Sequence, residues 1–208
     1  MSELFVPEGQ YDRVAIIAPG PSLTDEQIDK IMQAGIFTIG IGSMVFRNPF
    51  TDILYHCERK WWDYYEGAPE FHGCQRVSLE EVPNHPSVRY LHQSPDNNGL
   101  DLTTSTISAG SNSGYQAINL AAHYRPKEII LVGYDMKVKA DGTYNCIGQN
   151  PKPLQVGDAS KFTFFIQTME HLVDPLEKLG ITVYNCSLDT DLHCFQQSSL
   201  DDILKTKR

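Results

Sequence analysis

The sequence has no long hydrophobic run and no excess of positive charge, and each absence narrows what the chain can be. No apolar run approaches the roughly 18 residues that a bilayer-spanning helix needs, so we expect no membrane span and no membrane partner. The start of the chain, Met1-Ser2-Glu3-Leu4-Phe5, lacks the basic and apolar regions of a signal peptide. A formal net charge of −9 argues against a protein that is wrapped on nucleic acid, although a local basic patch is compatible with that total.

Regular cysteine spacing is also missing. The cysteines are odd in number and contain no C-x-x-C pair, which disfavours a disulfide framework and a zinc knuckle. Reduced thiols fit this pattern better, so we expect a cytoplasmic protein. The five cysteines are Cys57, Cys74, Cys146, Cys186 and Cys194.

What is present is an alternation of apolar strand patterns and amphipathic helix patterns over 208 residues. This alternation predicts an α/β fold: a single Rossmann-like domain over 1–208, with a mainly parallel sheet and helices on both faces. Strands are expected at 13–19, 36–41, 52–55, 127–133 and 181–184, with shorter ones near Val77, 88–91 and 102–104. Helices are expected after Thr24 and at 60–65, 115–124, 162–179 and 199–204.

The first strand ends in an unusual turn. The apolar run through Ala18 stops at Pro19-Gly20-Pro21-Ser22, and Thr24 with Gln27 then forms a capping-box pattern. A buried strand, a tight turn and a helix start form phosphate sites in many α/β proteins. The motif is neither G-x-G-x-x-G nor a P-loop, so neither dinucleotide binding nor P-loop chemistry follows. An ordinary tight turn with a helix cap is the alternative.

Polar residues follow several predicted strands. Because the carboxyl ends of parallel strands share one edge of the sheet, we expect these residues to converge there. Each also has an ordinary explanation: Ser113 as a helix cap, Asp135 as a turn residue and Lys137 as a solvated lysine. The candidates are Gly20, Pro21, Ser22, Gly42, Ser43, His56, Glu58, Ser113, Gly114, Asp135 and Lys137.

A long polar stretch at 138–158 is expected to be a lid or binding loop, because structureless loops of this length are uncommon inside compact domains. The aromatic cluster Trp61, Trp62, Tyr64 and Tyr65 is more typical of a core or an interface than of a stacking platform.

Two segments carry a family resemblance. Ile16–Leu23 resembles the "GxGPSL" opening of Campylobacter-type bacterial sialyltransferases. Ser113–Asn119 followed by Ile129–Met136 resembles their "TSG…IYLSGIDF" segment. The same pair marks the wider MptE-like (DUF115) proteins, which are related to an archaeal pterin diphosphokinase family. Tyr55–Glu58 together with Trp61-Trp62 looks closest to the phage members.

The resemblance implies where a nucleotide would bind. In the sialyltransferases, the opening loop and the helix start hold the cytidine nucleotide. Three asparagines of that family are absent here, because their positions fall at Pro19, near Gly42 and near His56. By position, the nucleotide would be held by Gly20, Pro21, Ser22, Ser113 and Gly114.

The resemblance also implies catalytic roles. Lys137 and Tyr144 lie nearest to the tyrosines that act on the leaving phosphate. The sialyltransferase base is a histidine in the loop before the last long helix, and residues 145–158 contain none. Asp135 or Asp158 would then have to accept the proton of the acceptor.

These observations predict a nucleotide-binding transferase, most simply a glycosyltransferase-like enzyme with a nucleotide-activated sugar as donor. Its acceptor would be a sugar or, for a phage enzyme, a modified DNA base. One alternative is a diphosphokinase-like phosphotransferase, with Mg²⁺ held by Glu58 and Asp135. Another is a phage or bacterial protein that binds a nucleotide without turnover. The sequence is compatible with a homo-oligomer.

Overall fold

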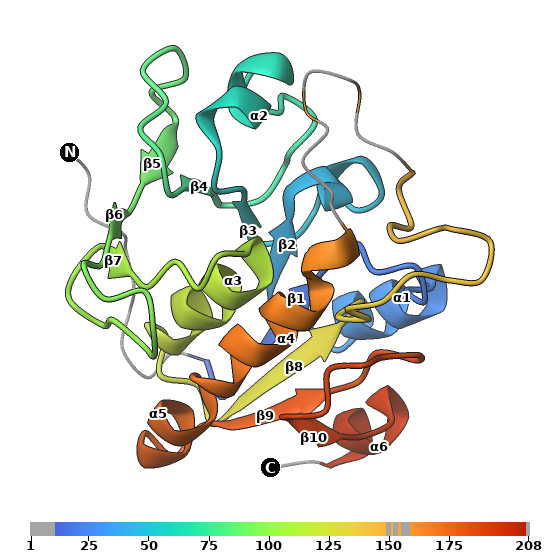
Figure 1. Cartoon of the computed structure of the whole chain (residues 1–208). Helices are drawn as coiled ribbons and strands as arrows, with labels where there is room; N and C mark the ends of the chain where they lie inside the picture. The colour runs from blue at the N-terminus through green and yellow to red at the C-terminus, as the bar shows by residue number, and fades with distance from the viewer. Residues whose placement is uncertain (1–10, 149–150, 152–153, 155–158, 207–208) are drawn as a thin grey trace.

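A parallel sheet forms the centre of the molecule (Figure 1). The computed structural model describes residues 11–148, 151, 154 and 159–206. The strands of the main sheet are β1 (Arg13–Ile17), β2 (Phe37–Ile41), β3 (Ile53–Tyr55), β4 (Gln75–Ser78), β5 (Val88–Tyr90), β8 (Glu128–Val132), β9 (Thr182–Asn185) and β10 (Gln196–Gln197). Their order is β10-β9-β8-β1-β2-β3-β4-β5, and every neighbouring pair is parallel. This confirms the predicted α/β class and the parallel sheet.

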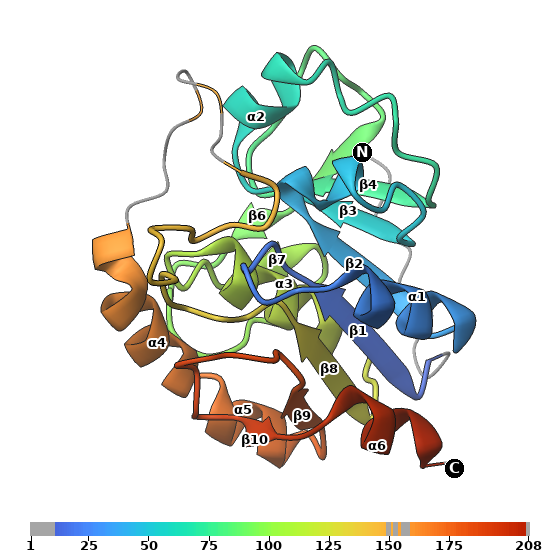
Figure 2. The same cartoon turned by 90° about the vertical axis from the view of Figure 1, so that its right-hand side faces the viewer.

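Helices cover both faces of the sheet, as Figures 1 and 2 show together. The alternation along β1 explains why: Val14 and Ile16 belong to the apolar cluster on one face, and Ala15 and Ile17 belong to the cluster on the other. The first face carries α3 (Ser113–Ala122), α4 (Phe162–Glu170) and α5 (Val173–Lys178), and the second carries α1 (Asp25–Gln33) and α6 (Leu200–Lys205). Within the described chain, no helix is long and apolar enough to cross a membrane.

The predicted helix over 162–179 is wrong in one respect, because it is two helices. α4 ends at its cap, His171, and α5 begins at Val173. Pro175 explains the break. It has no N–H to donate to the carbonyl of His171, and its ring clashes with that carbonyl in a continuous helix.

The predicted strand over 102–104 is also wrong. Asp101 accepts the backbone N–H of Thr103 at 2.8 Å, which bends this segment into a local turn. The strand that does form is β7 (Thr106–Ile107), which pairs with β6 (His92–Gln93) in a separate two-stranded sheet.

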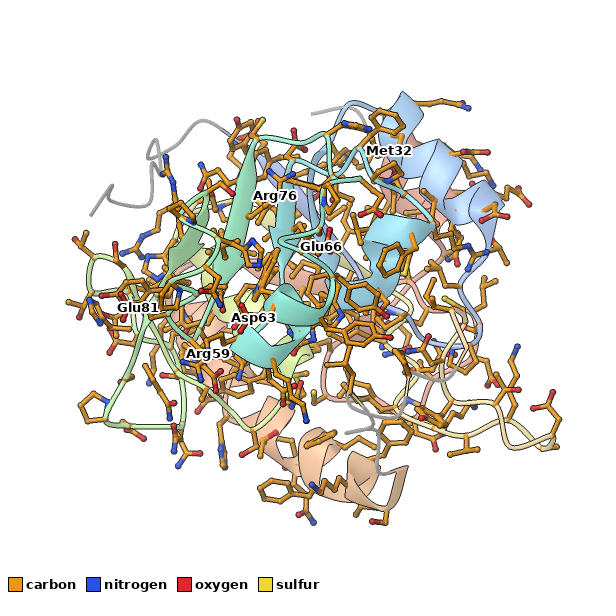
Figure 3. The ribbon with its side chains drawn as sticks, turned by 90° about the horizontal axis from the view of Figure 1, so that it is seen from above. Met32, Arg59, Asp63, Glu66, Arg76 and Glu81 are labelled. Atoms are coloured by element: carbon orange, nitrogen blue, oxygen red, sulfur yellow. The ribbon has the colours of Figure 1, made fainter. Side chains whose placement is uncertain are left out.

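The turn after α2 (Arg59–Tyr64) is held by one guanidinium group. Glu66, Gly67 and Ala68 all have positive φ (50°, 75° and 56°), which brings nearby carbonyls toward Arg76 of β4. The Arg76 side chain donates to the carbonyls of Gly67 at 2.9 Å, Ala68 at 3.2 Å and Phe71 at 2.9 Å. Figure 3 labels Arg76 of β4 and Glu66 of the turn after α2, and the two residues lie near each other.

We expect Arg76→Met to lower the free energy of unfolding by about 2–3 kcal/mol, because it keeps the apolar stem and leaves three carbonyls without their charged donor. Urea unfolding at neutral pH measures this. Arg59→Met is the matched control: that side chain is 57% exposed and its pair with Asp63 is long at 3.9 Å, so we expect a change within about 0.5 kcal/mol. Equal losses in the two variants would contradict this role for Arg76.

Candidate functional site

A cavity of about 280 Å³ opens at the carboxyl edge of the sheet. Strand β1 lies between β2 and β8, so the chain leaves β1 toward one side and returns on the other, and a crevice forms where the direction switches. Polar loops and helix starts meet in this crevice. Its lining includes Gly20 and Pro21 after β1, Gly42 and Ser43 after β2, His56 after β3, Asn112–Gly114 at the start of α3, Gly133–Met136 after β8, Tyr144 and Asn145, and Phe162 and Phe165 of α4.

The turn after β1 is fixed by the carboxylate of Asp135. The N–H and the hydroxyl of Ser22 donate to its two oxygens, at 2.6 and 2.9 Å, and the Gly20 N–H donates to the Gly133 carbonyl at 2.9 Å. Asp135 is 2% exposed, and burial raises the pKa of its carboxyl above the ordinary range. The N–H groups of Gly20 and Ser22 already donate within the protein, and Pro21 has no N–H. Residues 20–22 therefore offer no amide donor to a ligand, although Gly20 and Pro21 line the cavity. Asp135 holds this turn with both oxygens engaged, a geometry that favours positioning over proton abstraction.

The start of α3 is where amide donors are available. The side chain of Asn112 caps the helix by accepting from the Tyr115 N–H at 2.8 Å. The N–H groups of Ser113 and Gly114 have no partner among the described residues, and both residues line the cavity. Tyr134 helps to fix the first turn of α3, because its hydroxyl donates to the Gly114 carbonyl at 3.1 Å. Free N–H groups and the positive end of a helix dipole are features that favour an anion.

His56 enters the cavity as a neutral ring of fixed orientation. Its imidazole stacks on Trp61, with ring centroids 4.7 Å apart and planes 13° apart. Nδ1 accepts from the Glu58 N–H at 3.1 Å, which assigns the proton to Nε2. Gly42, at φ +53°, makes room for the ring, since a Cβ there would lie 2.9 Å from His56 Cδ2. Burial lowers the pKa of His56 to about 3, so the ring is a hydrogen-bond donor over the neutral range.

This burial predicts a pH effect on stability. The pKa of His56 is lower in the folded chain than in the unfolded chain, so the unfolded chain binds more protons between about pH 3 and 6.5 and stability falls as pH falls through that window. We expect the wild type to lose about 1–2 kcal/mol more than His56→Asn between pH 7 and pH 5, measured by urea unfolding. The pKa of His123 is also lowered, but His123 is present in both the wild type and His56→Asn, so its effect cancels in the comparison. Parallel pH profiles would contradict the expectation.

The predicted catalytic residues divide into three groups. Tyr144 and Asp135 line the cavity, and both oxygens of Asp135 accept from Ser22. Lys137 does not line it: its ammonium pairs with Asp189 and, at 3.6 Å, with Asp191, and these carboxylates raise the pKa of Lys137. The predicted position of Asp158 lies outside the described residues.

The carboxylates expected to hold Mg²⁺ are not brought together. Glu58 contributes its backbone N–H to His56, while its side chain is not part of the cavity lining. Asp135 is occupied by Ser22. Among residues 11–148, 151, 154 and 159–206, no three His, Cys, Asp or Glu side chains form a group that could hold a metal ion. Among the described residues, Asp135 is therefore the one carboxylate of this pair at the cavity, and both of its oxygens accept from Ser22.

Sequence reasoning missed two contributions to the site. Phe162 and Phe165 line the cavity, whereas the sequence predicted only a helix over 162–179. The loop after β9 also braces the end of β8: Ser187 accepts from the Tyr134 N–H at 2.7 Å, and the Thr190 hydroxyl donates to the Tyr134 carbonyl at 2.6 Å. For the loop after β9, the sequence showed only that polar residues follow a predicted parallel strand.

No protein-family model, curated protein or solved structure matches this chain.

Proposed function

We propose that this cavity binds a nucleotide, with a phosphate at the start of α3, and that the protein transfers a sugar from a nucleotide-activated donor. One observation carries the proposal: the N–H groups of Ser113 and Gly114 have no partner among the described residues, and both residues line the cavity at the start of a ten-residue helix, at the switch point of a parallel sheet. Nucleotide phosphates bind at this position in many α/β proteins.

In the proposed sugar transfer, uncharged hydrogen-bond donors would stabilise the leaving phosphate. When a sugar leaves its nucleotide, negative charge develops on a phosphate oxygen, and preorganised N–H and O–H groups stabilise it. The amides of Ser113 and Gly114, the Nε2–H of His56 and the hydroxyl of Tyr144 are the donors that support this role. No lysine or arginine is part of the described cavity lining, so Lys137 is not part of the proposed mechanism.

The experiment is a thermal-shift panel of CMP-, UDP-, GDP- and ADP-linked sugars and the free nucleotides, each with and without Mg²⁺. A ligand present at 100 times its Kd stabilises the folded state by about 2.7 kcal/mol, so we expect at least one compound to raise Tm by several degrees without Mg²⁺. If no nucleotide changes Tm, the proposal is wrong. If a compound shifts Tm only with Mg²⁺, the phosphotransferase alternative is favoured instead.

A second candidate is nucleotide binding without turnover. It is favoured by the state of Asp135, the carboxylate in the described lining, whose oxygens both accept from Ser22 and so are engaged. The two candidates separate when the best donor from the panel is incubated with the protein and released nucleotide is measured by chromatography. Release above the rate in buffer supports transfer or hydrolysis, and tight binding with no release supports the second candidate.

A further inference from the structure

The side of the cavity formed by α4 differs in chemistry from the α3 side. We propose that Phe162 and Phe165, named here the aromatic wall, form a second subsite that binds a planar, uncharged ring. The inference deepens the proposed function, because one source of such a ring is the base of the bound nucleotide. The other source is an aromatic group on a second substrate.

Core packing does not account for the two phenylalanines. They lie three residues apart, hence on the same side of α4, with ring centroids 6.5 Å apart. Ile166 and Met169 of the same helix pack into the main apolar cluster, but neither phenylalanine belongs to an apolar cluster of the described residues. Both rings are half-buried and line the cavity. α4 therefore packs on the sheet through one side and turns two aromatic rings toward the cavity with another.

A strained residue lines the same cavity. Met136 has φ +51°, a left-handed backbone conformation that residues other than glycine rarely adopt. Such strain persists only where the surrounding structure imposes it, and it clusters at binding and active sites. The hydrogen bonds around β8 supply that constraint, since Asp191 donates its N–H to the carbonyl of Asp135, the residue before Met136. A methionine sulfur also makes favourable contacts with aromatic rings, so Met136 adds a surface suited to the same ligand chemistry.

The charge distribution supports a neutral ring at the wall. The anion-binding groups of the cavity are at the start of α3, and the described lining has no cation near the aromatic wall. A ligand with a phosphate at one end and a flat ring at the other would use both sides. Stacking of a base on an aromatic side chain contributes about five- to 150-fold in affinity.

The test compares Phe165→Leu, which keeps an apolar side chain and removes the flat face, with the control Phe164→Leu, whose parent side chain is 51% exposed and outside the cavity lining. Calorimetry measures the Kd of uridine and adenosine 5′-monophosphate, ribose 5-phosphate and phenyl β-glucoside. We expect Phe165→Leu to weaken ring-bearing ligands about ten-fold, to leave ribose 5-phosphate unchanged, and the control to change neither.

The probes separate the sources of the ring. Weaker binding of the nucleotides assigns the wall to the base, and weaker binding of phenyl β-glucoside with unchanged nucleotide affinity assigns it to a second substrate. If the nucleotides bind the wild type and Phe165→Leu equally and phenyl β-glucoside binds neither, the subsite is wrong and the proposed function stands. If no phosphate compound binds but phenyl β-glucoside binds and is weakened by Phe165→Leu, the subsite stands and the proposed function is wrong. An equal loss for all probes, ribose 5-phosphate included, would make Phe165 a structural residue and overturn the inference.

Discussion

Gly133→Ala is expected to lower the free energy of unfolding by about 3 kcal/mol or more, a larger loss than that expected for Arg76→Met. Two causes add. The residue has φ +72°, which costs an alanine about 1–2 kcal/mol. In addition, the new Cβ would overlap the Ala18 carbonyl oxygen and lie 3.2 Å from the Gly20 nitrogen. These are backbone atoms of the turn that lines the cavity, so the clash is relieved only by separating the ends of β1 and β8.

Gly35→Ala is the matched control, because Gly35 has a similar φ of +64° but a Cβ there would have no neighbour within 4 Å. We expect it to cost about 1–2 kcal/mol, for the backbone conformation alone. Urea unfolding of both variants isolates the cost of the contact with Ala18. Equal losses would show that the ends of β1 and β8 can separate freely and that the turn after β1 is not fixed.

Ser113→Pro is expected to weaken phosphate binding about ten- to 100-fold while leaving the fold intact. Proline removes one of the two N–H groups that have no partner in the described part of the chain, and a hydrogen bond to a charged group is worth about 1.5–3 kcal/mol. The first helical position tolerates proline well. The residue before it, Asn112, is already extended at φ −154° and ψ 152°, as a residue preceding proline must be. The measurement is calorimetric titration with the nucleotide that gives the largest thermal shift.

Ser113→Ala serves as its control, since it removes the hydroxyl and keeps the N–H. That hydroxyl lies 3.4 Å from the Cys57 sulfur, a weak contact, so we expect less than about a three-fold change in affinity. If Ser113→Ala weakens binding as much as Ser113→Pro, the side chain binds the ligand and the helix amides do not. If neither changes the affinity, the phosphate binds elsewhere.

Much of the fold was predictable because its signals are local. The apolar runs around Val14 and Ile130 fill β1 and β8, and a run buried on both faces is typical of a parallel sheet. The cap at Thr24 was predictable for the same reason, and its hydroxyl accepts from the Gln27 N–H at 3.2 Å. The second half of that capping box does not form, because the Gln27 side chain donates to the carbonyl of Cys186 at 2.9 Å.

The partners of the site residues could not be predicted, since they depend on contacts between distant segments. Asp135 and Lys137 were expected to face a ligand because both follow a buried strand. The structure pairs Asp135 with Ser22, 113 residues away, and Lys137 with the carboxylates of Asp189 and Asp191. Local sequence patterns predict which residues reach the edge of a sheet. They do not predict which of those side chains pair with one another and so are not available to a ligand.

The central position of β1 in the sheet affects how the protein folds during synthesis. Its neighbour β2 is made soon after it, but its other neighbour, β8, follows only after a separation of 115 residues between Arg13 and Glu128. At translation rates of about 5–20 residues per second, the nascent chain carries an open, apolar strand edge for on the order of ten seconds. Such an edge is a template for mispairing, so this chain is expected to depend on chaperones during synthesis more than proteins built from neighbouring segments.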